Sequence, residues 1–198
     1  MSIRKDCFIY YEKYNIHNPY ILEWLENNTY YGGKIYDINI SRKQKWYQRE
    51  LGYFSPSWKK EYERWKAHPY DDILNELEIN IQKKVNNICN KYDIQSVQFN
   101  SCLVNVYENG DDLIKEHSDS QPVFGKEPVV CILSFGDTRT LVFTDKQTKK
   151  DVKHIELKHS SICIMAGKTQ QYYLHSIRKE KNKKKRYSLT FREYNINT

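Results

Sequence analysis

Apolar positions recur with two different periods along the chain, and the change of period falls near residue 96. Between Asp71 and Tyr92 the apolar side chains are three and four residues apart, which predicts one long amphipathic helix with Asp71 well placed at its N-terminus. A shorter helix is expected to open at Asn18-Pro19 and to run to about Asn27, because Asn caps helices and Pro suits the first helical position.

The remainder of the N-terminal part has weaker patterns. Residues 34–40 follow a Gly-Gly turn and are expected to form a strand. Residues 41–56 are basic and aromatic without a clean period, so we expect a connector there. Residues 57–68 carry aromatic side chains at helix-like spacing.

From residue 97 onward, short apolar runs alternate with Gly, Asp and Lys turns, which predicts strands. Strands are expected at 102–107, 129–135, 138–144, 152–157, 161–165 and 187–193. Many short strands are typical of a sandwich or jelly roll. Residues 178–186 are too charged for a core and are expected to form an exposed loop. The length predicts one domain of the α+β class, with N-terminal helices in 1–96 and the β core in 97–194.

Two polar side chains interrupt one face of the strand expected at 102–107. Alternate residues of a strand point to opposite sides, so Asn105 and Tyr107 share a face with Leu103, while the other face is apolar. A buried amide or phenol needs a hydrogen-bonding partner. We therefore expect a polar partner for Asn105 and Tyr107.

A candidate metal site begins at His117-Ser118-Asp119, where residues two apart in a strand point the same way. Taken alone, His-x-Asp is common on surfaces, and a solvated strand end is then the more frequent explanation. A second histidine, His175, follows another apolar run. Two imidazoles and one carboxylate form the facial triad of non-haem Fe(II) oxygenases, which predicts His117, Asp119 and His175 as the catalytic metal ligands.

The last strand, RYSLTFR, alternates between polar and apolar residues. Arg186, Ser188 and Arg192 fall on its polar face. If the apolar face packs on the helices, both guanidiniums point toward the metal, where an Arg needs an anion such as a dicarboxylate. An edge strand with both Arg residues in water is the alternative that alternation alone leaves open.

Composition favours a nucleic-acid partner. The net charge is +7, the pI is about 9.0, and 17 Tyr and 4 Trp often lie near Lys or Arg, which suits phosphate contacts and base stacking. The chain has neither a membrane-spanning stretch nor a signal-peptide pattern, so we expect a soluble, intracellular protein in nucleus or cytoplasm, by default a monomer. Five widely spaced cysteines without a CxxC motif predict reduced thiols.

The C-terminal half resembles the AlkB family of 2-oxoglutarate- and Fe(II)-dependent nucleic-acid dealkylases, especially its eukaryotic DNA and RNA repair members. The matching segments, in family order from Phe99 to Arg192, are FNSCLVNVY, HSD, LSFGDTRTLVF, LKHSSICIM, YYLHSI and RYSLTFR. Each is modest alone, and together they are highly specific. The resemblance implies a double-stranded β-helix (jelly-roll) core with N-terminal helices and a nucleotide-recognition lid.

The resemblance also implies cofactors and residue roles. His117, Asp119 and His175 would hold Fe(II). The 2-oxoglutarate site would contain Asn105, Tyr107, Arg186, Ser188 and Arg192, with Arg186 on the distal carboxylate and Arg192 beside the metal-chelating end. The implied activity is oxidative demethylation of N-alkylated bases in DNA or RNA by O2, which releases formaldehyde, succinate and CO2.

Upstream the match is weaker. Residues 42–44 (RKQ) and 52–56 (GYFSP) resemble parts of the recognition lid. The implied substrate-binding residues are Arg42, Gln44, Tyr53, Phe54 and Gln121. Arg42 and Lys43 would contact phosphate, and Tyr53 or Phe54 would lie against the base. A structural connector with solvated charges is the alternative. The basic loop at 179–185 is likewise either a clamp on the nucleic-acid backbone or a solvated loop.

Three positions depart from the family pattern. Ser120-Gln121 stand where repair members carry acidic residues, Ser188 where Asn is common, and Ser160 where Gly is usual. A neutral amide attracts a cation less than a carboxylate does, so the first departure argues against a cationic 1-methyladenine or 3-methylcytosine substrate. The same chemistry on a protein or lipid substrate, and a non-catalytic nucleic-acid-binding jelly roll, are alternatives. The sequence does not separate DNA from RNA.

Overall fold

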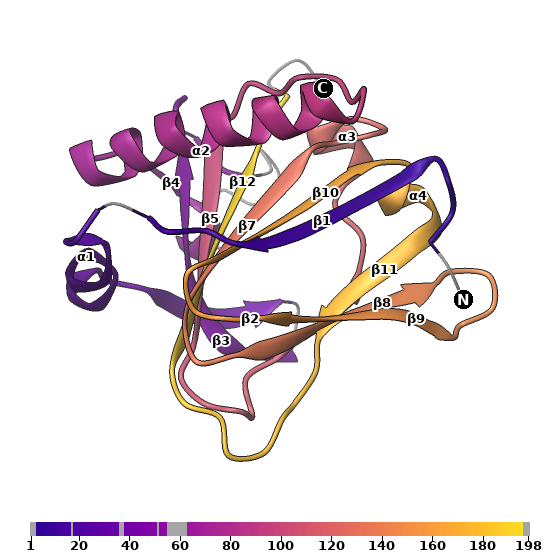
Figure 1. Ribbon diagram of the computed structural model, residues 1–198. Coiled ribbons are helices and arrows are strands. Elements are labelled where there is room, and N and C mark those ends of the chain that lie inside the picture. Colours follow the sequence, from indigo (N-terminus) through magenta and orange to yellow (C-terminus); the bar gives the residue numbers. More distant parts are fainter. Residues whose placement is uncertain (1–2, 17, 36–37, 51, 55–62, 196–198) are drawn as a thin grey trace.

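The computed structural model describes residues 3–16, 18–35, 38–50, 52–54 and 63–195, and within these ranges the chain forms two facing antiparallel sheets (Figure 1). The larger sheet runs in the order β1 (Cys7–Lys13), β10 (Ser161–Gly167), β7 (Val130–Gly136), β12 (Arg186–Arg192), β5 (Ser101–Tyr107), β3 (Ile38–Gln48) and β2 (Tyr31–Ile35). A two-residue strand, β4 (Ala67–His68), pairs with β3 in parallel.

The smaller sheet runs in the order β6 (Ile114–His117), β11 (Tyr173–Ile177), β8 (Arg139–Asp145) and β9 (Asp151–Leu157). Two one-turn helices, α3 (Gln121–Phe124) and α4 (Thr169–Tyr172), follow β6 and precede β11. The expected α+β jelly roll is confirmed. Its strand order brings β6 and β11 side by side in one sheet, opposite the β5 and β12 pair in the other.

The main core lies between the larger sheet and α2 (Asp72–Lys91), which crosses the face away from the smaller sheet (Figure 1). Asp71 caps this helix, since its side chain accepts a hydrogen bond from the Leu74 amide at 2.9 Å. Apolar residues of α2 pack against Val104 and Val106 of β5 and Leu189 of β12. The other face of the same strands is therefore turned toward the smaller sheet, between the two layers.

The N-terminal part differs from its expected form. Of the strand expected at 34–40, residues 34–35 end β2 and residues 38–40 begin β3, while 36–37 lie outside the described residues. The segment expected as a connector continues β3 to Gln48, and β3 pairs with β2. Arg42 and Gln44 of β3 are buried, whereas Ser41 and Lys43 are exposed. The strand therefore has polar side chains on both faces, and apolar alternation is lost from its sequence.

Two further expectations change in detail, and one strand was not expected. The first helix, α1 (Ile21–Asn27), begins later than expected, because the Asn18 side chain caps a turn at the Tyr20 amide instead. Strand β1 had no counterpart in the sequence prediction. Of residues 57–68, positions 57–62 lie outside the described residues, and the remainder forms a 3-10 turn at Glu63–Trp65 and β4. All five cysteines are free thiols, as expected.

Among the described residues, no helix combines the length and apolar character needed to cross a membrane.

Two isoleucines on α2 test how this helix is held. Ile81 is fully buried, whereas the Ile79 side chain is 64% exposed. Ile81→Ala leaves a cavity under the sheet and should lower the free energy of unfolding by about 2–5 kcal/mol. Ile79→Ala makes the same chemical change and should alter it by less than about 0.5 kcal/mol. Urea unfolding measures both, and equal effects would contradict the packing described.

Candidate metal centre and its cavity

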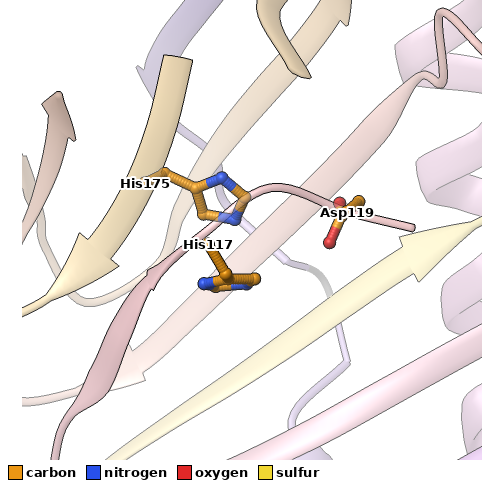
Figure 2. A group of neighbouring side chains, drawn as sticks. All are labelled: His117, Asp119 and His175. Atoms are coloured by element: carbon orange, nitrogen blue, oxygen red, sulfur yellow. The ribbon is translucent and has the colours of Figure 1, made fainter. Parts of the chain in front are cut away.

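Three potential metal ligands meet at the end of β6. His117 is the last residue of β6, Asp119 follows it in the chain, and His175 lies on β11 directly opposite His117 in the strand ladder. One ligand atom from each residue lies within 4.8 Å of the other two, and the imidazole ring centroids are 4.3 Å apart (Figure 2). The structure therefore brings together the three residues predicted as metal ligands.

Both imidazoles are in the form that binds metal. Burial, reinforced by the neighbouring His117, lowers the pKa of His175 to about 3, so this ring is neutral at pH 7. Burial also lowers the pKa of His117. The Nδ1 atom of His117 is 2.9 Å from the carbonyl oxygen of Lys115, which can only accept, so Nδ1 carries the proton and Nε2 keeps its lone pair.

The carboxylate of Asp119 is held ionised by a buried ion pair. Arg192 at the end of β12 donates to it from Nε at 3.1 Å and from Nη2 at 2.9 Å. Burial by itself would raise the pKa of Asp119, but Arg192 and the two imidazoles lower it to about 2. The Asp119 amide donates to Oε1 of Gln170 at 3.0 Å, which fixes the backbone as well.

The triad opens into a cavity of about 650 Å³ between the two sheets. The inward residues of β5 and β12 form one wall, and they include Asn105 and Tyr107. Trp46, Phe54 and Phe124 form an aromatic end, with the Trp46 and Phe54 rings edge to face at 5.3 Å. The cavity thus joins a polar, metal-ligating end to an aromatic end.

Arg186 is a buried cation, and no carboxylate of the described residues forms an ion pair with it. It is 1% exposed, and its Nη2 donates to the Ser134 hydroxyl at 2.9 Å. Within the described residues, its Nε and Nη1 have no hydrogen-bond partner, and the guanidinium lies over the Tyr107 ring at 5.2 Å. Donors left unpaired at this depth are costly, so the site fits a small carboxylate entering from the cavity.

The donor set fits Fe(II). Two neutral imidazoles and one ionised carboxylate on one side of an ion leave its other positions open to the cavity, which is the arrangement of non-haem Fe(II) oxygenases. Ser188 and Arg192 also line the cavity, between Arg186 and the triad along β12. All of the residues expected to bind metal or 2-oxoglutarate therefore border one space.

Two of the expected substrate residues have a different environment. Arg42 is buried, and its Nε donates to Oδ1 of Asn105 at 2.8 Å. A phosphate contact at the surface, as expected for Arg42, does not fit this burial. Gln44 is fully buried and accepts a hydrogen bond from Arg64, so it supports the cavity wall without lining it.

Of the other three expected substrate residues, only Phe54 lines the cavity. Phe54 lines the cavity, whereas Tyr53 forms a bridge with Lys66 and is not part of the lining. Gln121 is exposed at the start of α3, and its neighbour Ser120 lines the cavity instead. Ser120 lines the cavity in place of Gln121 because α3 begins at Gln121 and turns that side chain outward.

Sequence reasoning missed residues that hold the site from behind. Besides Gln170, Lys146 donates to the Ser118 hydroxyl at 3.0 Å and to the Gln170 carbonyl at 2.7 Å. Arg139, fully buried, binds the backbone carbonyls of Asn109, Asp112 and Arg178 and so ties the loops together. An Arg at the edge of an apolar run was the only sequence signal for Arg139, and the other two had none.

Metal affinity tests the triad directly. His175→Ala should lower the affinity for Co(II) or anaerobic Fe(II) at least about tenfold, because one of three protein ligands is lost. His154→Ala is the matched control, since His154 is exposed and pairs with Asp151 on β9. Calorimetric titration gives both affinities. Retention of wild-type affinity by His175→Ala, or an equal loss in the control, would contradict the site.

Comparisons with known proteins agree with this geometry. A profile of the 2OG-Fe(II) oxygenase superfamily matches residues 11–192. The human "Alpha-ketoglutarate-dependent dioxygenase alkB homolog 3" is 38% identical over 103 residues, which are 48% of this chain and 36% of that protein. The Arabidopsis thaliana "DNA oxidative demethylase ALKBH2" is 30% identical over 118 residues, covering 48% of this chain and 38% of that one.

The fold is also shared with a solved structure. The structure described as that of OsALKBH1 superposes with a TM-score of 0.65 at 17% identity, covering 98% of this chain and 100% of the other. The alignments cover little more than a third of the length of the two curated relatives. The match of the superfamily profile over nearly the whole chain is decisive: this chain belongs to the 2OG-Fe(II) oxygenase superfamily and has its Fe(II)-binding triad.

Proposed function

We propose that this protein is an Fe(II)- and 2-oxoglutarate-dependent dioxygenase that demethylates N-alkylated bases in DNA or RNA, with residues 1–198 acting as one catalytic domain. The observation that carries the proposal is one cavity bordered by the triad, by the Arg186 guanidinium with two unpaired donors among the described residues, and by an aromatic end. The relatives named as an alkB homologue and as a DNA oxidative demethylase support the choice of substrate.

The proposed reaction uses Fe(II), 2-oxoglutarate and O2 to oxidise an N-methyl group. When bound, Fe(II) and 2-oxoglutarate supply the reduction of O2, with one oxygen atom ending in succinate as CO2 leaves and the other inserted into a C–H bond of the N-methyl group. The hydroxymethyl amine then breaks its C–N bond, the nitrogen recovers a proton, and formaldehyde leaves. The protein contributes the position of each reactant and the exclusion of water.

Arg186 is the proposed anchor for the distal carboxylate of 2-oxoglutarate. Its Nε and Nη1 have no partner among the described residues and can donate to a carboxylate, and Tyr107 and Asn105 offer polar groups on the adjacent strand. Arg192 is already engaged with Asp119, so its role is to orient the metal ligand and to leave positive charge beside the chelating end of the co-substrate. Ser188 lies between the two arginines on the same face.

The aromatic end is the proposed base pocket. Phe54 and Phe124 are 5.8 Å apart between ring centroids, and Trp46 and Trp65 lie next to them. A flat base gains stacking and apolar contact against such walls. A base in a duplex does not reach this depth, so the target must be flipped out or be in a single strand.

The basic loop between β11 and β12 supports a nucleic-acid partner. Lys181 and Lys184 in this loop are exposed, and Lys179 both lines the cavity and pairs with Asp111 at 3.3 Å. Cations at the mouth of a base pocket suit contacts to the phosphates of the strand that carries the base. Such contacts position the strand without reading its sequence.

The affinity for 2-oxoglutarate tests the role of Arg186. Arg186→Met should raise the dissociation constant about a hundredfold, because two charge-assisted hydrogen bonds are lost. Arg178→Met removes a guanidinium from the exposed pair with Asp151 and should leave that constant within about threefold. Calorimetry with Mn(II) in place of Fe(II) measures both without turnover. Unchanged affinity in Arg186→Met would remove this residue from the site.

Formaldehyde release tests the whole proposal. The protein is mixed with Fe(II), 2-oxoglutarate and oligonucleotides carrying one methylated base, as DNA and as RNA, and formaldehyde and the restored base are measured. We expect release from at least one substrate and none from Asp119→Ala. Release from no alkylated DNA or RNA, with succinate formation stimulated by polypeptides, would move the substrate to protein.

A further inference from the structure

We propose that the base pocket selects an uncharged alkylated base over a cationic one, an inference that rests on the proposed function. N6-methyladenine and 1-methyladenine illustrate the difference, since each is adenine with one methyl group and only the second is a cation at neutral pH. The charges that surround the cavity, and whether an acidic one is free to pair with a cation, decide between the two bases.

Every acidic side chain on the cavity lining already has a basic partner. The pairs are Asp111 with Lys179 at 3.3 Å, Glu116 with Arg178 at 3.0 Å, and Asp119 with Arg192 at 2.9 Å. Asp119 is in addition the carboxylate of the triad. Among the described lining residues, no carboxylate is therefore free to neutralise a positively charged base.

Positive charge, by contrast, is in excess on the same lining. Arg42 lies in the wall of the cavity, and within the described residues its guanidinium donates to two neutral oxygens, the Asn105 amide and the Leu113 carbonyl, while the Asp112 carboxylate is its nearby charge. Arg64, directly behind this wall and 3% exposed, hydrogen-bonds to the neutral Gln44. Burial, with Arg42 nearby, lowers the pKa of Arg64 to about 10, so it is still a cation at pH 7. Of these two, Arg64 lies beside the aromatic end, over the Trp65 ring, so a second cation brought to that end is repelled.

The aromatic walls do not compensate for that repulsion. Aromatic faces attract cations, but here two of them already carry a guanidinium. The Arg192 guanidinium lies over the Phe124 ring at 5.0 Å, and that of Arg64 lies over the Trp65 ring at 5.6 Å. A cationic base would compete with these groups, whereas an uncharged base can stack without displacing them.

Ser120 is the position that controls this property. It lines the cavity one residue after Asp119 and offers an uncharged hydroxyl. A carboxylate at this position would offset part of the positive charge of the lining and would present a negative charge to the base. Gln121, the next residue, is exposed and outside the lining, so the same change there is a matched control.

The experiment compares single-stranded DNA and RNA oligonucleotides that carry either N6-methyladenine or 1-methyladenine at one site. Formaldehyde release gives kcat/KM for each, and fluorescence anisotropy without oxygen gives the affinity independently of turnover. The wild type should favour N6-methyladenine at least about tenfold. Ser120→Asp should shift that ratio toward 1-methyladenine about tenfold, and Gln121→Asp should shift it less than about threefold.

The outcomes separate this inference from the proposed function. Faster demethylation and tighter binding of 1-methyladenine by the wild type would overturn the inference and leave demethylation standing. An equal shift in Ser120→Asp and Gln121→Asp would overturn the role of Ser120. Release from neither substrate, with no preference in binding, would overturn both the inference and the demethylase function for adenine.

Discussion

The buried ion pair between Asp119 and Arg192 is the interaction on which the site depends. It joins the loop after β6, in the smaller sheet, to the end of β12, in the larger one. Arg192 keeps the carboxylate ionised and fixes its direction, and Gln170 fixes its backbone. Loss of either partner would leave an uncompensated buried charge, so the two sheets and the metal site are held by the same contact.

The cavity wall carries more basic side chains than unpaired acidic ones among the described residues. Burying a guanidinium without an anion is unfavourable, and Arg186 has two unpaired donors at 1% exposure. A small dicarboxylate relieves that cost on binding, which links co-substrate affinity to the stability of the folded cavity. The guanidinium of Arg64, which lies over the Trp65 ring, adds positive charge behind the aromatic end, where it bears on the charge of the base.

The strand and helix pattern predicted the parts of the fold that bury one apolar face. Helix α2 and strand β5 are of this kind, and the facing of Asn105 and Tyr107 away from the main core followed from alternation alone. Most of strand β3 was missed because two of its inward residues, Arg42 and Gln44, are polar and line or support a cavity. The burial of Arg42 could not be predicted, since a basic segment without a period reads as solvated.

The metal ligands were predictable for a different reason. The spacing of His117 and Asp119 is local, but the placement of His175 depends on the antiparallel pairing of β11 with β6. The most direct test of the account is an anaerobic titration of Fe(II) into protein and 2-oxoglutarate, followed by visible absorption. The account predicts a metal-to-ligand charge-transfer band that saturates at one Fe(II) per chain and is missing in Asp119→Ala. A band of full strength in that variant, or no band in the wild type, would contradict it.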